Sequence, residues 1–331
     1  MKFSIIIIAH KRKEYILEAV FSATYQNIPR DMYEIVVVKN FKDAKIDYAI
    51  EENGARSIYT DKEGLSDKVK IGILGSKGEI LCFLEDDDTF TNNKLSSILE
   101  AYNMDTSIDY IHNQQRKVLD NLRVEIRCKD QVLHQHLSEI VIKNPEKIVL
   151  KSLHFNLSSV SISRGLGNYF CELIPDGFIH IVDLSLFLAM FETNIFKFLF
   201  INQKLTDYKI HNSSHLYKGD FGDFAIFEYE LSLREITELK ALKKVMSNTI
   251  SLKIIDCLLL QWKLRNSIFL PIRHNRKNSF GLFIEIIKCL SKGFNIISIH
   301  DLIVSFFNVI SKDFAARVFF FVRFFRIAYA L

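Results

Sequence analysis

Four adjacent carboxylates occupy residues Glu85–Asp88, directly after a continuous apolar segment of the sequence. Two unit negative charges about 4 Å apart repel by roughly 4 kcal/mol at an effective dielectric constant near 20, so a partly buried run of this kind needs a cation. Carboxylate oxygens are the ligands that the hard divalent ions Mg2+ and Mn2+ prefer. The run therefore predicts a metal site, and the alternative is a solvated turn with ordinary surface carboxylates.

The elements that would position this run alternate between buried strands and amphipathic helices. Short β-branched apolar runs predict the strands, and apolar residues at helical spacing predict the helices between them. The strands are expected at Phe3–Ala9, Glu34–Val38, Arg56–Tyr59 and Glu79–Leu84, and the helices at Glu14–Gln26, Ser66–Ser76 and Asn92–Tyr102. Right-handed crossovers then predict a parallel sheet. The acidic run follows a strand at its carboxyl end, where open α/β sheets bind ligands.

Beyond residue 102 the pattern is less regular. The segment from Tyr110 to about Lys129 is expected to be strand-like or irregular, Ser159–Ser163 a strand, and Asp183 to about Phe191 a strongly apolar helix. Around residues 217–223 the composition changes, and the remainder predicts helices rich in Leu, Ile and Phe. Single cores stop growing at about 250 to 300 residues, so a chain of 331 residues predicts two lobes.

Several spaced motifs in the first ninety residues agree with one known pattern. Ser4–Arg12 resembles S-V-I-I-P-T-Y-N-R, Glu34–Asn40 resembles E-I-I-V-V-D-D, and Gly64–Asp88 aligns without gaps to G-L-S…G…G-E…F-L-D-x-D-D. These motifs are typical of the family 2 glycosyltransferases of the GT-A fold, which the chain resembles. The resemblance implies an α/β fold with a mostly parallel, Rossmann-like sheet and flanking helices, to which a helical C-terminal region is added.

The resemblance also implies a division of roles along the chain. Residues 1–115 would bind the nucleotide sugar, residues 116–223 would bind the acceptor, and residues 224–331 would form the helical region. The implied reaction moves a sugar from a nucleotide diphosphate sugar to a hydroxyl group of a glycan or lipid-linked acceptor, with inversion at the anomeric carbon. The alternative is a catalytically silent homologue that binds sugar nucleotide or membrane as a scaffold, because several positions depart from the family pattern.

The family's D-x-D motif assigns roles within the acidic run. Its acids hold a divalent cation, Mn2+ or Mg2+, that bridges the two phosphates of the donor. The matching residues are Glu85 and Asp87, Asp88 shares this role, and Asp86 is assigned to the donor. The metal matters because the departing nucleotide diphosphate gains negative charge as the glycosidic bond breaks. His211, in an element that resembles Y-R-x-H-x-x-x-S, is a further candidate metal ligand.

The remaining contacts to the nucleotide fall in the first loop and at the end of the second strand. Ile8, His10 and Arg12 match the family's first strand and nucleotide loop. Asn40 stands where family members commonly have a carboxylate that accepts the N3 proton of uracil. Its amide oxygen can also accept this proton, whereas the ammonium of Lys39 cannot. A UDP-sugar is therefore the expected donor.

Two lysines lie near the position of the family's phosphate-binding Arg-Asn pair. An ammonium group suits a diphosphate, so Lys68 and Lys70 are candidate phosphate ligands, and the alternative is that both are solvated helix lysines. His10 is also open to a second interpretation, as an ordinary histidine of a surface loop.

An inverting transfer needs a general base that takes the proton from the attacking hydroxyl group. Asp183 matches the family's acid at the start of a helix, with Val182 where a second acid is often found. The alternative is a purely structural helix N-cap, a position at which Asp is favoured. Asp176, just before Gly177, is the rival base if the alignment is shifted.

Composition narrows the setting in which the protein works. The net charge is only +4, and the first two thirds contain no dense Arg/Lys block with interleaved aromatic residues, which argues against a nucleic acid partner. Five widely scattered cysteines predict reduced thiols in a cytoplasmic protein. Charged residues from His10 onward end the N-terminal apolar run too early for a signal peptide.

The C-terminal third consists of apolar segments that charges interrupt. None offers about twenty uncharged apolar residues, so no transmembrane helix is expected. Four residues form one polar stripe on an otherwise apolar helix, namely Asp301, Ser305, Asn308 and Lys312. Aromatic-rich segments with Arg317, Arg323 and Arg326 favour peripheral attachment to the inner face of the cell membrane, beside a lipid-linked or envelope-polysaccharide acceptor. The alternative is that these helices pack only on each other and on the catalytic lobe.

Overall fold

The computed structural model describes residues 2–10, 12–119, 155–193, 197–210, 221–269, 276–291 and 299–328. The chain divides into two compact units. The first comprises Met1–Lys143 and Ser152–His211, and the second comprises Asn144–Lys151 and Asn212–Leu331. Every described strand belongs to the first unit, and the second unit is helical in its described residues.

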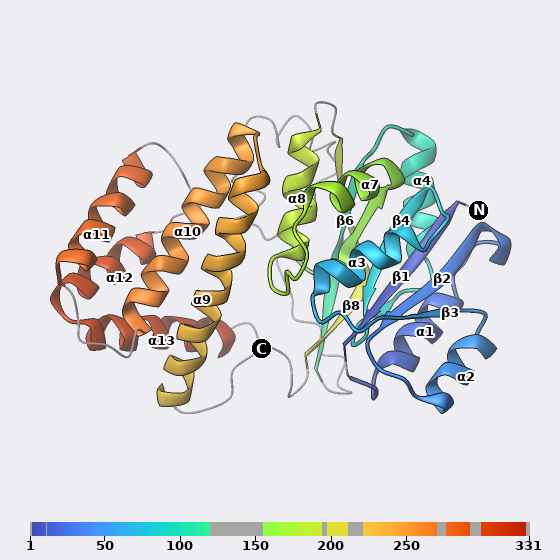
Figure 1. Ribbon diagram of the computed structural model, residues 1–331, viewed down its shortest axis with the longest axis horizontal. Coiled ribbons are helices and arrows are strands. Elements are labelled where there is room, and N and C mark those ends of the chain that lie inside the picture. Colours follow the sequence, from blue (N-terminus) through green and yellow to red (C-terminus); the bar gives the residue numbers. More distant parts are fainter. Residues whose placement is uncertain are drawn as a thin grey trace. The chain divides into compact units, whose positions relative to one another are not determined.

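Four parallel strands form one half of an eight-stranded sheet (Figure 1). They lie in the order β3 (Arg56–Tyr59), β2 (Tyr33–Lys39), β1 (Phe3–Ala9) and β4 (Ile80–Glu85). All seven residues of β1 are buried, as expected of a strand covered on both faces. The four predicted strands and their parallel pairing are thereby confirmed.

The other half of the sheet mixes strand directions. Beyond β4 lie β7 (Val160–Ser163), β6 (Tyr110–Leu119), β8 (Phe198–Ile210) and β5 (Thr89–Phe90), in that order. β7 is antiparallel to both β4 and β6, β6 is parallel to β8, and β5 is antiparallel to β8. Among the described strands, four of the seven neighbouring pairs are thus parallel, which confirms a mostly parallel α/β sheet.

Helices cover both faces of the parallel half. Ile5 and Ile7 of β1 face a buried cluster that includes residues of α1, α2 and α4. On the opposite face, α3 lies so close to β1 that a Cβ atom on Gly72 would stand 2.3 Å from Cγ2 of Ile6. The helices of this unit are α1 (Ile16–Thr24), α2 (Ala44–Glu52), α3 (Leu65–Leu74), α4 (Lys94–Met104), α7 (Arg164–Leu173) and α8 (Val182–Glu192), with 3-10 turns η1 (Arg30–Met32) and η2 (Leu157–Ser159).

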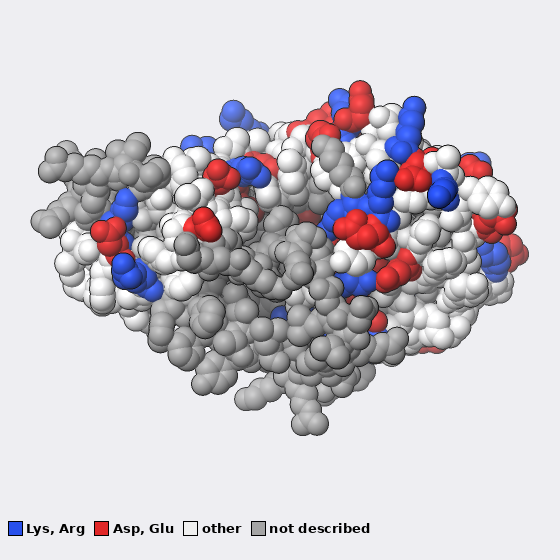
Figure 2. Space-filling model, turned by 90° about the horizontal axis from the view of Figure 1, so that it is seen from below, with Lys and Arg blue, Asp and Glu red and all other residues white. Residues whose placement is uncertain are grey.

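The second unit contains the helices rich in Leu, Ile and Phe that the sequence predicts. They are α9 (Phe221–Val245), α10 (Thr249–Phe269), α11 (Arg276–Ser291), α12 (Ile299–Ile310) and α13 (Lys312–Ala328). None of the helices in the described ranges combines the length and the apolar character that a membrane crossing needs. On the face that Figure 2 shows, the described acidic and basic side chains of the molecule are interspersed.

Helix α12 is oriented with its polar side inward. Ser305 and Asn308, two members of the predicted polar stripe, are 1% and 0% exposed, and Nδ2 of Asn308 donates to Oγ of Ser267 on α10 at 3.0 Å. Asp301 accepts from Nε2 of Gln261, also on α10, at 3.0 Å. The exposed large apolar side chains of this helix and of the start of α13 are Ile303, Phe306, Ile310 and Phe314. Asp301, Ser305 and Asn308 therefore lie on the inward side of α12, whereas Lys312, the fourth residue of the predicted stripe, lies on α13.

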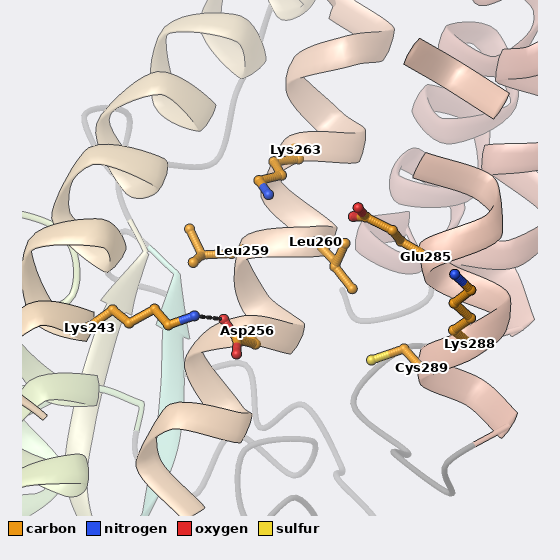
Figure 3. Close-up of a pocket in the computed structure, with 8 residues that line it drawn as sticks. All are labelled: Lys243, Asp256, Leu259, Leu260, Lys263, Glu285, Lys288 and Cys289. Carbon is orange, nitrogen blue, oxygen red and sulfur yellow. Dashed lines mark hydrogen bonds and ion pairs between the residues drawn. The ribbon is translucent and has the colours of Figure 1, made fainter. Parts of the chain in front are cut away.

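A pocket of about 320 Å³ opens beside α10 and α11 (Figure 3). Lys243 of α9 forms an ion pair with Asp256 at one side of this pocket, and Lys288 lies on α11. Sγ of Cys289 in the lining is 3.5 Å from Sγ of Cys257. The tertiary structure thus brings together two thiols that stand 32 positions apart in the sequence.

Candidate active site

The carboxyl ends of the parallel strands place the predicted site residues at one edge of the sheet. Ile8 of β1 lies opposite Glu85 of β4 in the strand register, and the backbone N–H of Asp86 donates to the carbonyl oxygen of Ile8 at 3.1 Å. The Ile8 side chain is 3% exposed and belongs to the core, so the backbone is what Ile8 presents at this edge. The acidic run therefore begins where β4 ends, beside the first loop.

Burial makes the acidic run electrostatically costly. Asp86 and Asp88 are each 1% exposed. Removal from water raises the pKa of Asp86 to about 6, and removal from water together with the charge of Asp87 raises the pKa of Asp88 to about 7. Burial, followed by the charges of Asp87, Asp88, Asp183 and Asp86, also raises the pKa of Glu85 well above its usual range. The solvated-turn alternative is thus excluded for this run.

Arg12 supplies positive charge to two members of the run. Its guanidinium NH2 is 2.5 Å from Oδ1 of Asp86, and its NH1 is 2.5 Å from Oδ2 of Asp87. The backbone N–H of His10 donates to the other oxygen of Asp86 at 3.1 Å. The first loop, which the sequence assigns to the nucleotide, therefore contacts the acidic run directly.

Asn156 joins the acidic run to the predicted general base. Its Nδ2 donates to Oδ2 of Asp88 at 3.0 Å, and its backbone N–H donates to Oδ2 of Asp183 at 3.3 Å. The residue is 3% exposed and has φ +73°, which makes it the sole non-glycine residue with positive φ among those described. Such backbone conformations cost about 1 to 3 kcal/mol and persist where the surroundings over-determine them. Sequence reasoning missed Asn156, for which the pattern carries no signal.

The backbone around Asn156 is anchored from two sides. The Ser158 N–H donates to Oδ1 of Asn156 at 2.7 Å, and Oγ of Ser158 accepts the N–H of Glu85 at 2.9 Å. Behind it, Nζ of the fully buried Lys94 donates to the Ser158 carbonyl at 2.6 Å. The second oxygen of Asp88 accepts the backbone N–H of Lys209, on β8, at 2.9 Å. The turn η2 with its cap Asn156, helix α4 and strand β8 thus hold this part of the site in place.

Asp183 is the second residue of α8, and the N-cap position belongs to Ile181. The helix N-cap alternative for Asp183 is therefore wrong. Its Oδ1 accepts the N–H of Leu184 at 2.7 Å, and burial raises the pKa of Asp183 to about 6. Its charge is close enough to raise the pKa of Glu85 and of Tyr110. The rival base Asp176 is instead largely exposed and forms a 2.5 Å ion pair with Lys70.

A second group of polar side chains lies at the ends of β1 and β2. Nζ of Lys68 is 2.9 Å from Nδ1 of His10, and Nδ2 of Asn40 is 3.3 Å from the same atom. Lys68 is 1% exposed, so it is not a solvated helix lysine. Nζ of Lys39 points away from this group, to Oδ1 of Asp47 at 2.7 Å. The structure therefore brings together His10, Asn40 and Lys68, and it places Lys70 elsewhere, against Asp176.

The predicted ligand His211 lies outside the described residues. Within the described part of the chain, no three His, Cys, Asp or Glu side chains are grouped as a ready-made metal site. In the described part of the chain, the carboxylates that lie close together at the candidate site are those of the acidic run and Asp183.

Part of the chain is similar in sequence to a known family. Residues 4–134 match the sequence model of Glycosyl transferase family 2. The matched segment contains the first loop, Asn40, both candidate lysines and the whole acidic run. No curated protein matches the chain in sequence.

Solved structures show that the chain has the GT-A fold. S. aureus TarS 1-349 in complex with UDP-GlcNAc is 14% identical, with a TM-score of 0.55 over 96% of this chain and 90% of that chain. The mannosyltransferase PcManGT from Pyrobaculum calidifontis, in complex with GDP-Man and Mn2+, is 11% identical, with a TM-score of 0.53 over 94% of this chain and 88% of that chain. A longer TarS chain is covered over 54% of its length, at 14% identity and a TM-score of 0.55 over 96% of this chain.

Proposed function

We propose that the enzyme transfers a sugar, with inversion, from a nucleotide diphosphate sugar to a hydroxyl group of a glycan or lipid-linked acceptor. The observation that carries this proposal is the pair of buried acidic groups, the run at the end of β4 and Asp183 on α8, that Asn156 links through two hydrogen bonds. The run at the end of β4 suits a metal ion that binds the donor's diphosphate, and Asp183 suits proton removal from the acceptor. The donors in the TarS and PcManGT structures, UDP-GlcNAc and GDP-Man, support a nucleotide sugar, and we favour UDP.

Glu85 and Asp87 fit a divalent metal ion by donor type and by electrostatic demand. Carboxylate oxygens suit Mn2+ and Mg2+, and the neighbouring acids raise the pKa of Glu85 in a way that a cation would relieve. Both oxygens of Asp88 already accept hydrogen bonds, so we assign Asp88 to orienting the run. When bound, a divalent ion neutralises the charge that develops on the departing diphosphate. Mn2+ is present in the PcManGT structure.

Asp183 is the proposed general base. A base is effective when its pKa lies near the working pH, and burial raises the pKa of Asp183 to about 6. The hydrogen bonds from Leu184 and Asn156 hold the carboxylate in one orientation. Asp183 would take the acceptor's proton as the hydroxyl oxygen attacks the anomeric carbon, in a single displacement that inverts that carbon.

The direct test is turnover of nucleotide sugars in the presence of Mn2+, measured as release of the nucleoside diphosphate. Asp87→Ala should abolish turnover and weaken Mn2+ binding, whereas Asp31→Ala, at an exposed position of η1, should change neither. Donor binding without turnover in the intact protein, under every acceptor class tried, would instead favour the catalytically silent homologue.

The outward apolar side of α12 and α13 supports peripheral membrane contact as part of this proposal. Large apolar side chains are rarely left exposed on consecutive turns of a helix in a monomer without a partner. Here Ile303, Phe306 and Phe314 are 45%, 48% and 50% exposed, and the cationic Arg317 is exposed on the same helix as Phe314. Apolar side chains beside a cation suit a bilayer with anionic headgroups.

Vesicle flotation tests this contact with the full chain. The triple change Ile303→Ser, Phe306→Ser and Phe314→Ser should reduce binding to vesicles that contain anionic lipid. The matched control, Leu74→Ser with Met104→Ser, removes apolar side chains that are 71% and 82% exposed in the first unit. Equal flotation of both variants and the unchanged protein would contradict membrane contact through α12 and α13.

A further inference from the structure

The end of β2 lacks the carboxylate that would contact a base, and the structure shows where the replacing lysine goes. Nζ of Lys39 is 2.7 Å from Oδ1 of Asp47 and donates to the carbonyl oxygen of Phe41 at 2.8 Å. The Lys39 side chain is 2% exposed. Lys39 therefore bonds to α2 and to its own loop, whereas Asn40 faces the polar side chains at the ends of β1 and β2.

A carboxylate from another part of the sequence reaches this group. Oε2 of Glu63, in the loop between β3 and α3, is 3.4 Å from Nδ2 of Asn40 and 3.4 Å from Nε2 of His10. The Glu63 side chain is 57% exposed and that of His10 is 46% exposed, so a ligand can reach both. Glu63 thus places a carboxylate beside the end of β2, which lacks one of its own.

Lys68 fixes the position of Glu63 and the tautomer of His10. Its ammonium donates to the Glu63 carbonyl oxygen at 2.9 Å and lies 2.9 Å from Nδ1 of His10. An ammonium group has no lone pair, so Nδ1 must accept, and in the neutral ring the hydrogen is on Nε2, toward Glu63. The buried lysine thereby orients both side chains without itself being exposed.

We propose that Glu63 reads the base of the nucleotide donor and selects bases that carry a hydrogen on a ring nitrogen next to a carbonyl group, as uracil and guanine do. This inference rests on the proposed function, because it assumes a nucleotide sugar donor. A carboxylate only accepts hydrogen bonds, so it pairs with the N3–H of uracil or the N1–H of guanine. The Asn40 amide, which can donate, suits the adjacent carbonyl oxygen.

The same carboxylate disfavours cytosine and adenine. Each of these bases presents a lone pair at the corresponding ring nitrogen, which would face the negative oxygens of Glu63. A hydrogen bond to an ionised acceptor is roughly twice as strong as a neutral one, and a site built to hydrogen-bond a ligand discriminates strongly against an analogue that leaves its polar groups unpaired. The nucleotide preference should therefore depend on the charge of Glu63.

Binding of free nucleoside diphosphates to the full chain, measured by calorimetry with Mn2+ present, tests the proposal. The probes are UDP, GDP, CDP and ADP, together with N3-methyl-UDP, which lacks the ring hydrogen. The unchanged protein should bind UDP or GDP at least about tenfold more tightly than CDP and ADP, which corresponds to about 1.4 kcal/mol. If UDP is preferred, methylation of N3 should remove most of this advantage.

Glu63→Gln supplies the decisive variant, because its amide can donate to the bare ring nitrogen of cytosine. The ratio of UDP to CDP affinity, or of GDP to CDP affinity, should fall by about tenfold relative to the unchanged protein, and N3-methylation should matter less than before. The matched control is Glu52→Gln, an exposed glutamate at the end of α2, which should leave every ratio unchanged.

The outcomes separate this inference from the proposed function. If the unchanged protein binds UDP or GDP and Glu63→Gln lowers the affinity for all four nucleotides by one common factor, or for none, the role of Glu63 in base selection is wrong and the donor assignment stands. If the unchanged protein binds no nucleoside diphosphate, the proposed function and the inference both fail. Circular dichroism of the variant identifies a folding defect, in which case Glu63→Asp, which keeps the charge, must retain the original preference.

Discussion

The acidic run of the first unit and helix α12 of the second unit both bury polar side chains, but the buried groups differ in kind. In the first unit, Asp86 and Asp88 are charged acids whose burial raises their pKa values. In the second unit, Ser305 and Asn308 are neutral groups, and Asn308 hydrogen-bonds across to α10. Burying a charge costs much more than burying a hydrogen-bonded amide. The acidic run is therefore a costly arrangement that suits a cationic ligand, and the contact of α12 with α10 is an inexpensive one that holds two helices together.

The largest expected effect tests whether Asp183 belongs to the chemistry of the first unit. Asp183→Asn should lower kcat by about 10²- to 10⁴-fold, measured as sugar transfer at saturating donor. The control is Asp176→Asn, which changes an exposed aspartate paired with Lys70. A large loss in the Asp176 variant and none in the Asp183 variant would reverse the assignment.

The pH dependence of the same activity follows from the direction in which the pKa of Asp183 is shifted. The carboxylate must be deprotonated to accept a proton, and burial raises the pKa of Asp183 to about 6. Activity should therefore be constant above about pH 7 and fall as the pH drops through about 6. The residual activity of Asp183→Asn should not fall in this way as the pH drops. If it still falls through about pH 6, the decrease is due to the titration of another group.

A smaller effect is expected at Asn156, where function and backbone strain can be separated. Both Asn156→Ala and Asn156→Gly remove the side-chain hydrogen bond to Asp88, and each should reduce kcat by about tenfold or more. Only glycine adopts φ +73° without strain. Asn156→Ala should therefore be less stable than Asn156→Gly by about 1 kcal/mol in denaturant unfolding. Equal stabilities would mean that the backbone at Asn156 is not strained.

The cost of the buried acids can be measured as a pH-dependent stability. Burial raises the pKa of Asp88 to about 7 from an ordinary value of 3.8. The stability that this group contributes is fully present below about pH 4 and is lost as the pH rises through about 7. Without metal, Asp88→Asn should gain Tm relative to the unchanged protein between pH 4 and pH 8, by about 3 °C or more. A constant difference across this range would contradict a raised pKa.

Effects on stability alone should appear on the two sides of α12. Asn308→Ala leaves the partly buried hydroxyl of Ser267 without its amide partner and should cost about 1 to 3 kcal/mol of unfolding free energy. Ile303→Ser, on the exposed side of the same helix, should change it by less than about 0.5 kcal/mol. If the exposed change were the more costly one, the inward polar orientation of α12 would be wrong.

Sequence reasoning was reliable where local pattern and local chemistry coincide. The strands expected at Phe3–Ala9 and Arg56–Tyr59 have these bounds in the structure. For the first of them, a short apolar β-branched run is a strong local signal. The helices α2 and α7 and the long strand β8 were not anticipated. Helix α2 buries only Ile50, and α7 buries only Leu166, Gly167 and Phe170, so each has few core residues to predict it from. The strands that pair with β8 are distant in the sequence.

The candidate site likewise contains residues that a local motif reveals and residues that it does not. Glu85–Asp88, with its carboxylates after a buried strand, is visible as a motif, and the family resemblance adds Asp183. Asn156 and Glu63 are not visible as motifs, because each contacts residues that are distant in the sequence. Asn156 contacts residues 27 and 68 positions away, and Glu63 contacts Asn40, 23 positions away. The Lys39 departure also had no sequence explanation until its ion pair with Asp47 was seen.

By itself, the sequence determined the parallel half of the sheet and the position of the acidic run at a strand's carboxyl end. Hydrophobic periodicity and consecutive motif residues are local properties, and they survive without knowledge of contacts. The tertiary structure alone decided that Arg12 meets Asp86 and Asp87, that Asn156 links Asp88 to Asp183, and which side of α12 faces inward. These outcomes depend on which distant groups can satisfy a buried charge or hydrogen bond, and only the folded chain determines that.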